Sequence, residues 1–371
     1  MKLRFKKHVA LTLISLMLLS LIGCGKPAST ETTTTTEAAV TEAPAASISD
    51  AATTADSTPA DASEEGSDAQ TVYPVTVTDQ AGREVTIEKE PESIVSGYYI
   101  STSLLLALGL KDKVTGIEAK ADKRPIYKLA APEFLELPNV GTAKEFDLET
   151  CASLSPELVI LPMKLKDAAQ SLSELDIPVL LVNPESEDQL EQMIELVSTA
   201  TNTKGNADAL LSYIDEKKEM LEKDLSGVDA KSVYLAGNSS LLSTAGPAMY
   251  QSGLIELAGG KNAASEITDT YWAEISYEQL LAWDPSYIIL ASDAEYTPED
   301  VLNDENLKEC TAVKNGNVYA IPGDIEALDS PVPGGILASI WLAGILHPDQ
   351  VSADMYTEEK AAFYETFYGI K

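Results

Sequence analysis

The spacing of apolar residues predicts an α/β protein in which short buried strands alternate with helices. Near the start of the folded part, valines alternate with polar residues on both sides of a turn at 79–82, a pattern typical of a β-hairpin. Short apolar runs indicate strands buried in a parallel sheet at 94–95, 158–160, 179–182, 233–235, 287–289 and 318–321, and we predict a further strand at 114–117. We predict helices between these strands, among them 101–108, 189–197 and 335–346.

The longest predicted helix lies in the middle of the chain. Between residues 206 and 225, leucine, isoleucine and methionine recur at near-helical spacing, and charged residues fill the positions between them. This segment separates two halves of similar pattern.

One short phrase occurs in both halves, and its two copies are 129 residues apart. Glu149 is followed seven residues later by Pro156 and an apolar run, and Glu278 is followed in the same way by Pro285 and an apolar run. Each copy predicts a short helix that the proline terminates, and then a buried strand. The repeat therefore predicts two similar α/β lobes, and the alternative is chance similarity between ordinary helix–strand units.

The two glutamates of the repeat occupy a particular place in their helices. Asp147 and Ser276 precede them by two residues and are suitable helix N-caps. A glutamate in the first turn of a helix is favoured by the helix dipole and keeps its carboxylate in solvent. We therefore expect Glu149 and Glu278 to be exposed acids at equivalent places of the two lobes.

The first 24 residues are typical of an export signal. Four basic residues form its start, and the apolar stretch that follows is too short to span a membrane comfortably. The stretch ends in Leu-Ile-Gly-Cys at 21–24, which resembles a bacterial lipobox and predicts that Cys24 becomes the lipidated first residue. An ordinary secretory signal or an N-terminal anchor helix is the alternative.

Residues 25–72 differ in composition from the rest of the chain. They include five consecutive threonines at 32–36, and alanine, serine, proline and acidic residues fill most other positions. Such a segment buries too little apolar area to offset the entropy lost on ordering. We therefore expect a disordered stalk between the anchor and a body that begins near residue 73.

Charge and cysteine content exclude several partners and one disulfide. The formal charge of −33 becomes −37 when the four cations of the leader are removed, which argues against binding of nucleic acid or anionic lipid by the body. Besides Cys24 the chain has Cys151 and Cys310, one in each half. We expect two buried free thiols rather than a disulfide that joins the lobes.

Several short motifs are weak singly but specific in their order. They are the turn Asp-Gln-Ala-Gly-Arg at 79–83, Leu-Pro-Asn-Val-Gly at 137–141, Glu-Leu-Ala-Gly-Gly-Lys-Asn at 256–262, Val-Lys-Asn-Gly-Asn-Val-Tyr at 313–319, Trp-Leu at 341–342 and Leu-His-Pro at 346–348. With these motifs the body at 73–371 resembles the substrate-binding lipoproteins of bacterial ABC importers for iron siderophores, haem and cobalamin.

The resemblance implies an α/β fold of two lobes with central, mostly parallel sheets, one long joining helix and a ligand cleft between the lobes. The N-terminal lobe is expected at 73–204, the joining helix at 205–226 and the C-terminal lobe at 227–371. The resemblance also implies that Glu149 and Glu278 dock onto arginines of an ABC permease dimer that works with a cytoplasmic ATPase. The expected protein is a monomer without enzymatic activity or cofactor, lipid-anchored at the outer face of the cytoplasmic membrane or periplasmic.

In open α/β sheets, ligands bind outside the carboxyl ends of the strands. Those ends carry aromatic residues here, and the second half adds the polar segments 238–249 and 324–330. Aromatic faces with a few polar groups suit a bulky chelate or macrocycle. We predict ligand contacts from Tyr98, Tyr99, Ser101, Arg124, Tyr127, Tyr250, Tyr271 and Trp272. For each aromatic residue the alternative is a place in the core, where we expect Trp283 and Trp341.

Arg124 is one of two arginines after the leader, and the other, Arg83, lies in the hairpin turn. At the carboxyl edge of a strand, the Arg124 guanidinium could pair bidentately with a carboxylate or hydroxamate oxygen of the ligand. The alternative is a solvated loop charge among neighbouring lysines.

The ligand that we expect is a metal chelate, with a ferric siderophore as the first choice. Few cations reach the predicted cleft, which favours hydroxamate or mixed siderophores over triply anionic catecholates. Cobalamin or another corrinoid is the second choice, and haem is a third, with a tyrosine as its axial ligand. His347 is the one histidine after the leader and precedes a proline at a predicted helix end, so we expect no site for a bare metal ion.

Two other classes of protein compete with this interpretation. An enzyme is disfavoured because the chain has no nucleophile elbow and no phosphate-binding glycine loop. Glutamates on separate lobes would also lie too far apart for a glycosidase pair, whose carboxylates lie within about 10 Å of each other. A surface adhesin would explain the anchor and the stalk but not the duplication.

Overall fold

The computed structural model describes residues 70–268 and 270–371. These residues belong to one compact unit, Glu65–Lys371. The leader at 1–24 with Cys24 and nearly all of the stalk at 25–72 lie outside the described residues, so the predictions for them stay predictions. Among the described helices, none combines the length and the apolar character that crossing a bilayer requires.

The described part opens with the hairpin that the alternating valines predicted. Strand β1 (Val75–Thr78) pairs antiparallel with β2 (Glu84–Ile87). In the turn, the Asp79 carboxylate accepts hydrogen bonds from two backbone N–H groups and forms an ion pair of 2.7 Å with Arg83. Arg83, one of the two arginines after the leader, is thereby held in the hairpin turn.

The N-terminal lobe is built on a parallel sheet with the strand order β4-β3-β5-β6. Its strands are β3 (Ile94–Ser96), β4 (Val114–Gly116), β5 (Leu158–Pro162) and β6 (Val179–Val182). Its helices are α1 (Tyr99–Ala107), α2 (Pro125–Ala130), α3 (Leu148–Ser153), α4 (Lys166–Ser173) and α5 (Glu187–Thr201). All residues of β3, β5 and β6 are buried, which explains why these strands are continuous apolar runs.

The C-terminal lobe repeats this arrangement with the order β12-β11-β7-β9, again parallel throughout. The strands are β7 (Lys231–Ala236), β9 (Gly260–Asn262), β11 (Tyr287–Leu290) and β12 (Val318–Ala320), and a separate antiparallel ribbon consists of β8 (Ser243–Ala245) and β10 (Trp272–Glu274). The helices are α7 (Tyr250–Leu257), α8 (Tyr277–Trp283), α9 (Pro298–Leu302) and α10 (Thr311–Asn315). In both sheets the first strand lies between the second and the third, so the predicted duplication is confirmed.

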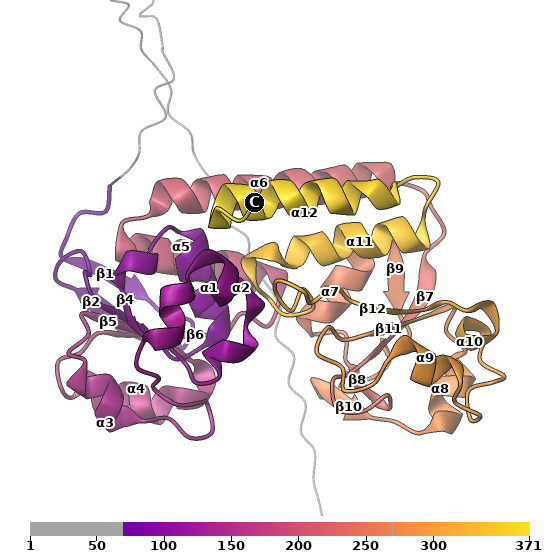
Figure 1. Cartoon of the computed structure of the whole chain (residues 1–371), viewed down its shortest axis with the longest axis horizontal. Helices are drawn as coiled ribbons and strands as arrows, with labels where there is room; N and C mark the ends of the chain where they lie inside the picture. Colours follow the sequence, from indigo (N-terminus) through magenta and orange to yellow (C-terminus); the bar gives the residue numbers. More distant parts are fainter. Residues whose placement is uncertain (1–69, 269) are drawn as a thin grey trace, which may run out of the picture. The chain divides into compact units, whose positions relative to one another are not determined.

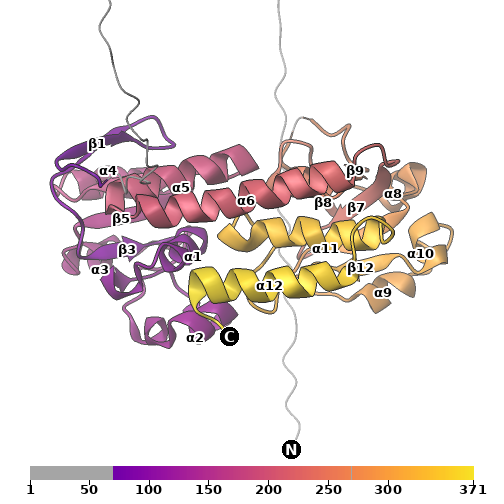
Figure 2. The same cartoon turned by 90° about the horizontal axis from the view of Figure 1, so that it is seen from above.

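Three long helices connect the lobes (Figures 1 and 2). Helix α6 (Lys204–Asp224) is the predicted joining helix, α11 (Ile336–Leu346) packs beside it, and α12 (Ala353–Tyr368) packs beside α11. Figure 2 shows that α12 returns toward the N-terminal lobe, where it contacts α1. The side chains of Ser103 and Tyr368 meet there at 2.9 Å between their hydroxyl oxygens. The lobes are therefore joined by one covalent connector and also by α12.

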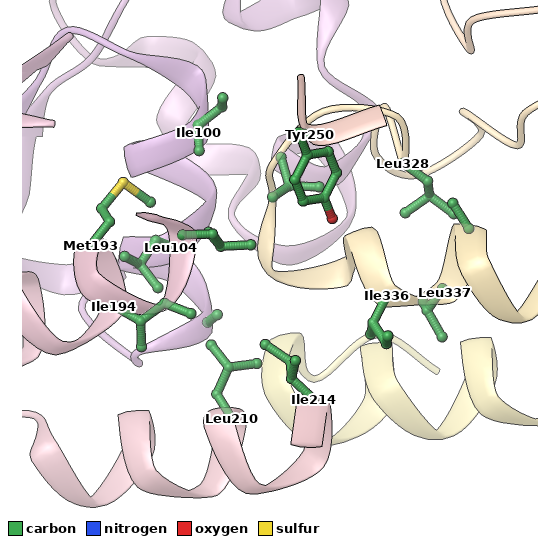
Figure 3. Packing of buried hydrophobic residues seen from close by; sticks show 14 of the residues in the cluster. Ile100, Leu104, Met193, Ile194, Leu210, Ile214, Tyr250, Leu328, Ile336 and Leu337 are labelled. Atoms are coloured by element: carbon green, nitrogen blue, oxygen red, sulfur yellow. The ribbon is translucent and has the colours of Figure 1, made fainter. Parts of the chain in front are cut away.

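The largest cluster of buried apolar residues extends through both lobes. Figure 3 shows side chains of α1, α5 and α6 beside side chains of α7 and α11 in this shared core. Two smaller clusters belong to single lobes, and they contain Cys151 and Cys310. Both cysteines are free and buried, which confirms the expectation of two unpaired thiols. Burial raises the pKa of the Cys151 thiol to about 12.

Candidate functional site: the cleft between the lobes

A cavity of about 480 Å³ lies between the lobes at the carboxyl ends of their first strands. The N-terminal lobe contributes Tyr98–Ile100, which follow β3, and Glu185, which follows β6. The C-terminal lobe contributes Asn238–Ser240, which follow β7, and residues of four further segments. The cavity therefore lies at the sheet edge where the topology rule places a ligand.

Two tyrosines form the aromatic wall of the N-terminal lobe. Tyr98 and Tyr99 pack edge to face with ring centroids 5.4 Å apart. The Tyr99 hydroxyl donates a hydrogen bond of 2.9 Å to Ser330 Oγ of the other lobe. Burial raises the pKa of both phenols, so each remains a neutral hydroxyl at physiological pH. Both predicted residues thus line the cavity, while their contact with a ligand stays a prediction.

Trp272 faces them from the C-terminal lobe. It is the first residue of β10, is 40% exposed and lines the cavity. A Cβ atom on Gly237, directly after β7, would lie 3.1 Å from the Trp272 ring, so a glycine leaves room for the indole. Tyr271 was predicted beside it but does not line the cavity. Its side chain is 57% exposed, and its backbone carbonyl accepts a hydrogen bond of 2.8 Å from Gly246.

Carboxylates are the charged groups of the cavity. Glu185, Glu274 and Asp329 line it, and no lysine, arginine or histidine of the described residues does. Asp329 is buried, and Oδ1 of its side chain accepts hydrogen bonds from the backbone N–H and the hydroxyl of Ser292. Burial raises the pKa of Asp329.

Gln251 lies next to Asp329 in the cavity wall and is 7% exposed. Its Nε2 donates a hydrogen bond of 2.8 Å to the backbone carbonyl of Asp329, which fixes the orientation of the amide. The other amide atom, Oε1, is buried and has no hydrogen-bond partner among the described residues. Leaving such an acceptor unpaired costs about 1–3 kcal/mol.

Arg124 lies outside this cavity, in a second one of about 30 Å³ that is too small for a chelate. Its guanidinium stacks over the Tyr99 ring, 3.9 Å from the centroid, and lies 3.7 Å from the carboxylate of Asp293 in the other lobe. The structure thus connects Arg124 to the cavity through Tyr99. These contacts support a role for Arg124 in positioning Tyr99 and linking the lobes, rather than the direct ligand contact that we predicted.

Three other predicted ligand residues are buried away from the main cavity. Ser101 is inside α1, which begins at Tyr99 rather than at the predicted serine, and its hydroxyl donates to the Tyr98 carbonyl at 2.8 Å. The Tyr127 hydroxyl donates at 2.6 Å to the buried carboxylate of Glu118 and is enclosed with it. Tyr250 belongs to the shared core, beside Ile336 and Leu337 in Figure 3. For Tyr127 and Tyr250 the alternative of a core position is confirmed.

The repeated glutamates occupy equivalent helices. Asp147 caps α3 by accepting a hydrogen bond from the Thr150 N–H, and Ser276 caps α8 in the same way. Glu149 and Glu278 lie in the first turns and are exposed, and neither forms an ion pair within the described part of the chain. The backbone N–H of Glu278 and the Ser276 hydroxyl lower the pKa of Glu278. In Figure 1, α3 and α8 lie on the side of the lobes away from α6 and α12.

His347 has a structural environment. The side chain is 5% exposed, and its Nε2 lies 3.0 Å from the carbonyl oxygen of Gly259. Among the described residues, no group of three or more histidine, cysteine, aspartate or glutamate side chains is arranged to hold a metal ion.

The sequence profile described as "Periplasmic binding protein" matches residues 94–325, more than half of the chain. The chain belongs to this family. As a periplasmic binding protein it is an extracytoplasmic component of an ABC importer. The matched residues include both sheets and most of the residues that line the cleft, while Asp329–Pro331 lie beyond the match.

Proteins that bind different solutes are similar to this chain. An uncharacterized ABC transporter substrate-binding lipoprotein of Bacillus subtilis, YvrC, is 29% identical over 70% of this chain and 82% of its own length. The molybdate-binding protein MolA of Haemophilus influenzae is 24% identical over 79% of this chain and 90% of its own length. A periplasmic solute binding protein of Veillonella parvula superposes with a TM-score of 0.71 at 26% identity, over 80% of this chain and 93% of that one.

Proposed function

We propose that this periplasmic binding protein captures a metal chelate, with a ferric siderophore as the preferred ligand, and delivers it to an ABC permease. One observation carries the proposal: tyrosines of one lobe and a tryptophan of the other line a cavity of about 480 Å³ at the carboxyl ends of both sheets. Aromatic faces supply the large apolar contact that a chelate needs. The relatives are solute-binding proteins, which supports binding without turnover.

The charged side chains that line the cavity favour some chelates over others. A triply anionic catecholate complex, or an oxyanion such as the molybdate that MolA binds, needs convergent cations, whereas carboxylates line this cavity. A hydroxamate siderophore carries no such charge and fits the site better. The same carboxylates favour a corrinoid over haem, because haem brings carboxylates of its own, and a corrinoid is therefore the second candidate.

Delivery is proposed to use the repeated glutamates. Glu149 and Glu278 are exposed, occupy the first turns of equivalent helices and belong to different lobes. One acid for each subunit of a permease dimer would match the symmetry of such a partner. We further propose that Cys24 carries the lipid anchor, that residues 25–72 serve as the stalk and that the protein acts as a monomer.

Fluorescence titration tests ligand capture. The purified mature protein is titrated with ferrichrome, cyanocobalamin, haemin, ferric enterobactin and molybdate, and tryptophan emission is recorded. We expect saturable quenching by a hydroxamate siderophore or a corrinoid, and recovery of the ligand unchanged by mass spectrometry. Trp272→Phe should lose part of the quenching, and the matched control Trp283→Phe, outside the cavity lining, should keep it. Absence of saturable binding by every chelate would refute the proposal.

A further inference from the structure

We infer that the cleft selects chelates that carry a positive charge and hydrogen-bond donors on their periphery. The inference rests on the proposed function, because it names the chemistry of the ligand in the same cavity. The charged side chains that line the cavity are Glu185, Glu274 and Asp329, and within the described residues no cationic side chain lines it. A cationic ligand would be the partner that these acids lack.

The two partly exposed acids belong to opposite walls. Glu185 follows β6 in the N-terminal lobe, and Glu274 ends β10 in the C-terminal lobe. Neither carboxylate accepts a hydrogen bond or forms an ion pair within residues 70–268 and 270–371. A positive group held between the lobes would be attracted by both acids, since the cavity walls reduce screening by water.

Asp329 provides a third acceptor deeper in the wall. Oδ1 receives both donors of Ser292, and Oδ2 has no hydrogen-bond partner in the described part of the chain. Gln251 of the same wall donates from Nε2 to the Asp329 backbone carbonyl, so the acceptor Oε1 and not the amide nitrogen is left without a partner among the described residues. The buried unpaired oxygen is an independent sign that a donor belongs at this place.

Arg124, the cation that stacks on a tyrosine of the cleft, does not line the main cavity. It pairs with Asp293 and lines the small neighbouring cavity, so it does not compensate these acids. The cavity wall thus presents acceptors and aromatic faces together. Such a surface fits a chelate that has an ammonium group or several primary amides, and it disfavours carboxylate or catecholate groups.

Matched ligand pairs separate charge from shape. Ferrioxamine B has a free ammonium group, and its N-acetylated form has the same iron centre without that charge. Aquocyanocobinamide and dicyanocobinamide form a corrinoid pair that differs by one charge. For whichever class binds, we expect the cationic member to bind at least about tenfold more tightly at low salt. This preference should shrink as the ionic strength rises.

Isosteric variants locate the selectivity. Glu185→Gln with Glu274→Gln should remove most of the preference for the cationic member while the neutral member binds as before. Glu256→Gln, an exposed acid on α7 that does not line the cavity, is the matched control and should keep the preference. Gln251→Leu should weaken both members of a pair several-fold, because the shared amide donors lose their acceptor.

The outcomes separate the two proposals. Tight binding of a chelate with equal affinity for both members, or with preference for ferric enterobactin, would overturn the inference and leave chelate capture intact. A preference that survives Glu185→Gln with Glu274→Gln would also overturn it. Binding of no chelate at all would overturn both proposals.

Discussion

The two lobes have one scaffold and two different walls. Both sheets are parallel, place the first strand between the second and the third, and follow a glutamate-bearing helix with the third strand. At the cleft, however, the N-terminal lobe presents Tyr98 and Tyr99, whereas the C-terminal lobe presents hydroxyls, amides and two of the three acids. The scaffold that both lobes share therefore suits the proposed docking, in which both lobes would act alike. The cavity walls, which differ between the lobes, suit recognition of an asymmetric ligand.

Charge reversal of both glutamates tests the shared part and should have the largest effect. We expect Glu149→Lys with Glu278→Lys to abolish uptake into cells, because each permease arginine would then face a lysine. Ligand affinity of the purified protein should not change, since both residues lie in exposed helix starts away from the cavity. Uptake of the labelled chelate and titration of the same variant measure the two effects.

The matched control for docking is Glu136→Lys with Glu256→Lys, which makes the same change of charge at exposed acids outside α3 and α8. The single reversals sharpen the comparison, because equivalent lobes predict similar losses from each. Full uptake by the double variant of Glu149 and Glu278 would end the docking proposal, and a loss from one lobe alone would show that the lobes are not functionally equivalent.

A substitution of Glu326 tests the contact between α1 and α12, which joins the lobes. It is buried between Ser103 of α1 and Tyr364 of α12, whose hydroxyls both donate to its carboxylate, and burial raises its pKa from the ordinary 4.5 to about 7. Between these two pH values the folded state keeps a proton that the unfolded state has lost. The stabilisation is therefore complete below pH 4.5 and is lost as the pH rises through 7, by about 3 kcal/mol.

Urea unfolding at about pH 5 and about pH 7.5 measures this effect. In Glu326→Gln the side chain cannot ionise, so between these two pH values the free energy of unfolding should lose about 2 kcal/mol of pH dependence relative to the unaltered protein. Glu256→Gln controls for the repulsion among the many acids of the chain. Identical pH profiles of Glu326→Gln and the unaltered protein would show that Glu326 ionises as freely in the fold as outside it.

Substitutions of Arg124 test the link between the two lobes, and we expect a smaller effect on ligand affinity. Arg124→Ala should weaken binding several-fold, about 1 kcal/mol, because Tyr99 loses the guanidinium that stacks on its ring. Arg124→Lys keeps the charge beside Asp293 but loses the planar stack, so it should recover part of the affinity. If instead Arg124 touches the ligand, the alanine variant should lose affinity for anionic chelates only, which titration with ligands of different charge would reveal.

The two thiols should give the smallest response. Cys151 and Cys310 are fully buried in the separate clusters of the two lobes. We expect neither to react with Ellman's reagent until the protein is unfolded, and reductant should leave the melting temperature unchanged. Rapid reaction of one thiol in the native protein would show that its lobe opens locally.

Much of the scaffold could be predicted from the sequence because its strands are buried on both faces. The runs at Leu158–Ile160 and Val179–Val182 have no polar positions and therefore indicated strands directly. Helix α12 and the ribbon of β8 and β10 were not predicted. In α12 mixed aromatic, acidic and small residues give no clear helical stripe, and the ribbon strands have three residues each.

The cleft was harder to predict than the sheets. Tyr98 and Tyr99 follow the carboxyl end of β3 in the sequence, and so the sheet rule could find them. Trp272 was predicted as an aromatic residue just before the second copy of the repeat, although the strand that carries it was not predicted. Ser101 was predicted at the cleft because the helix was expected to begin there, whereas α1 begins at Tyr99 and Ser101 lies inside it. Glu185 and Gln251 carry no local signal, since they reach the cavity only through the packing of one lobe against the other.

The shared core has a mechanical consequence. Residues of α1, α5, α6, α7 and α11 pack as one continuous cluster, and α12 ties the C-terminal end of the chain to α1 (Figures 2 and 3). Swinging the halves wide apart would tear this cluster open and expose its apolar surface to water. If a permease docks at Glu149 and Glu278 as proposed, we expect ligand release to rearrange the cavity segments around Asn238 and Trp272 while the shared core stays closed.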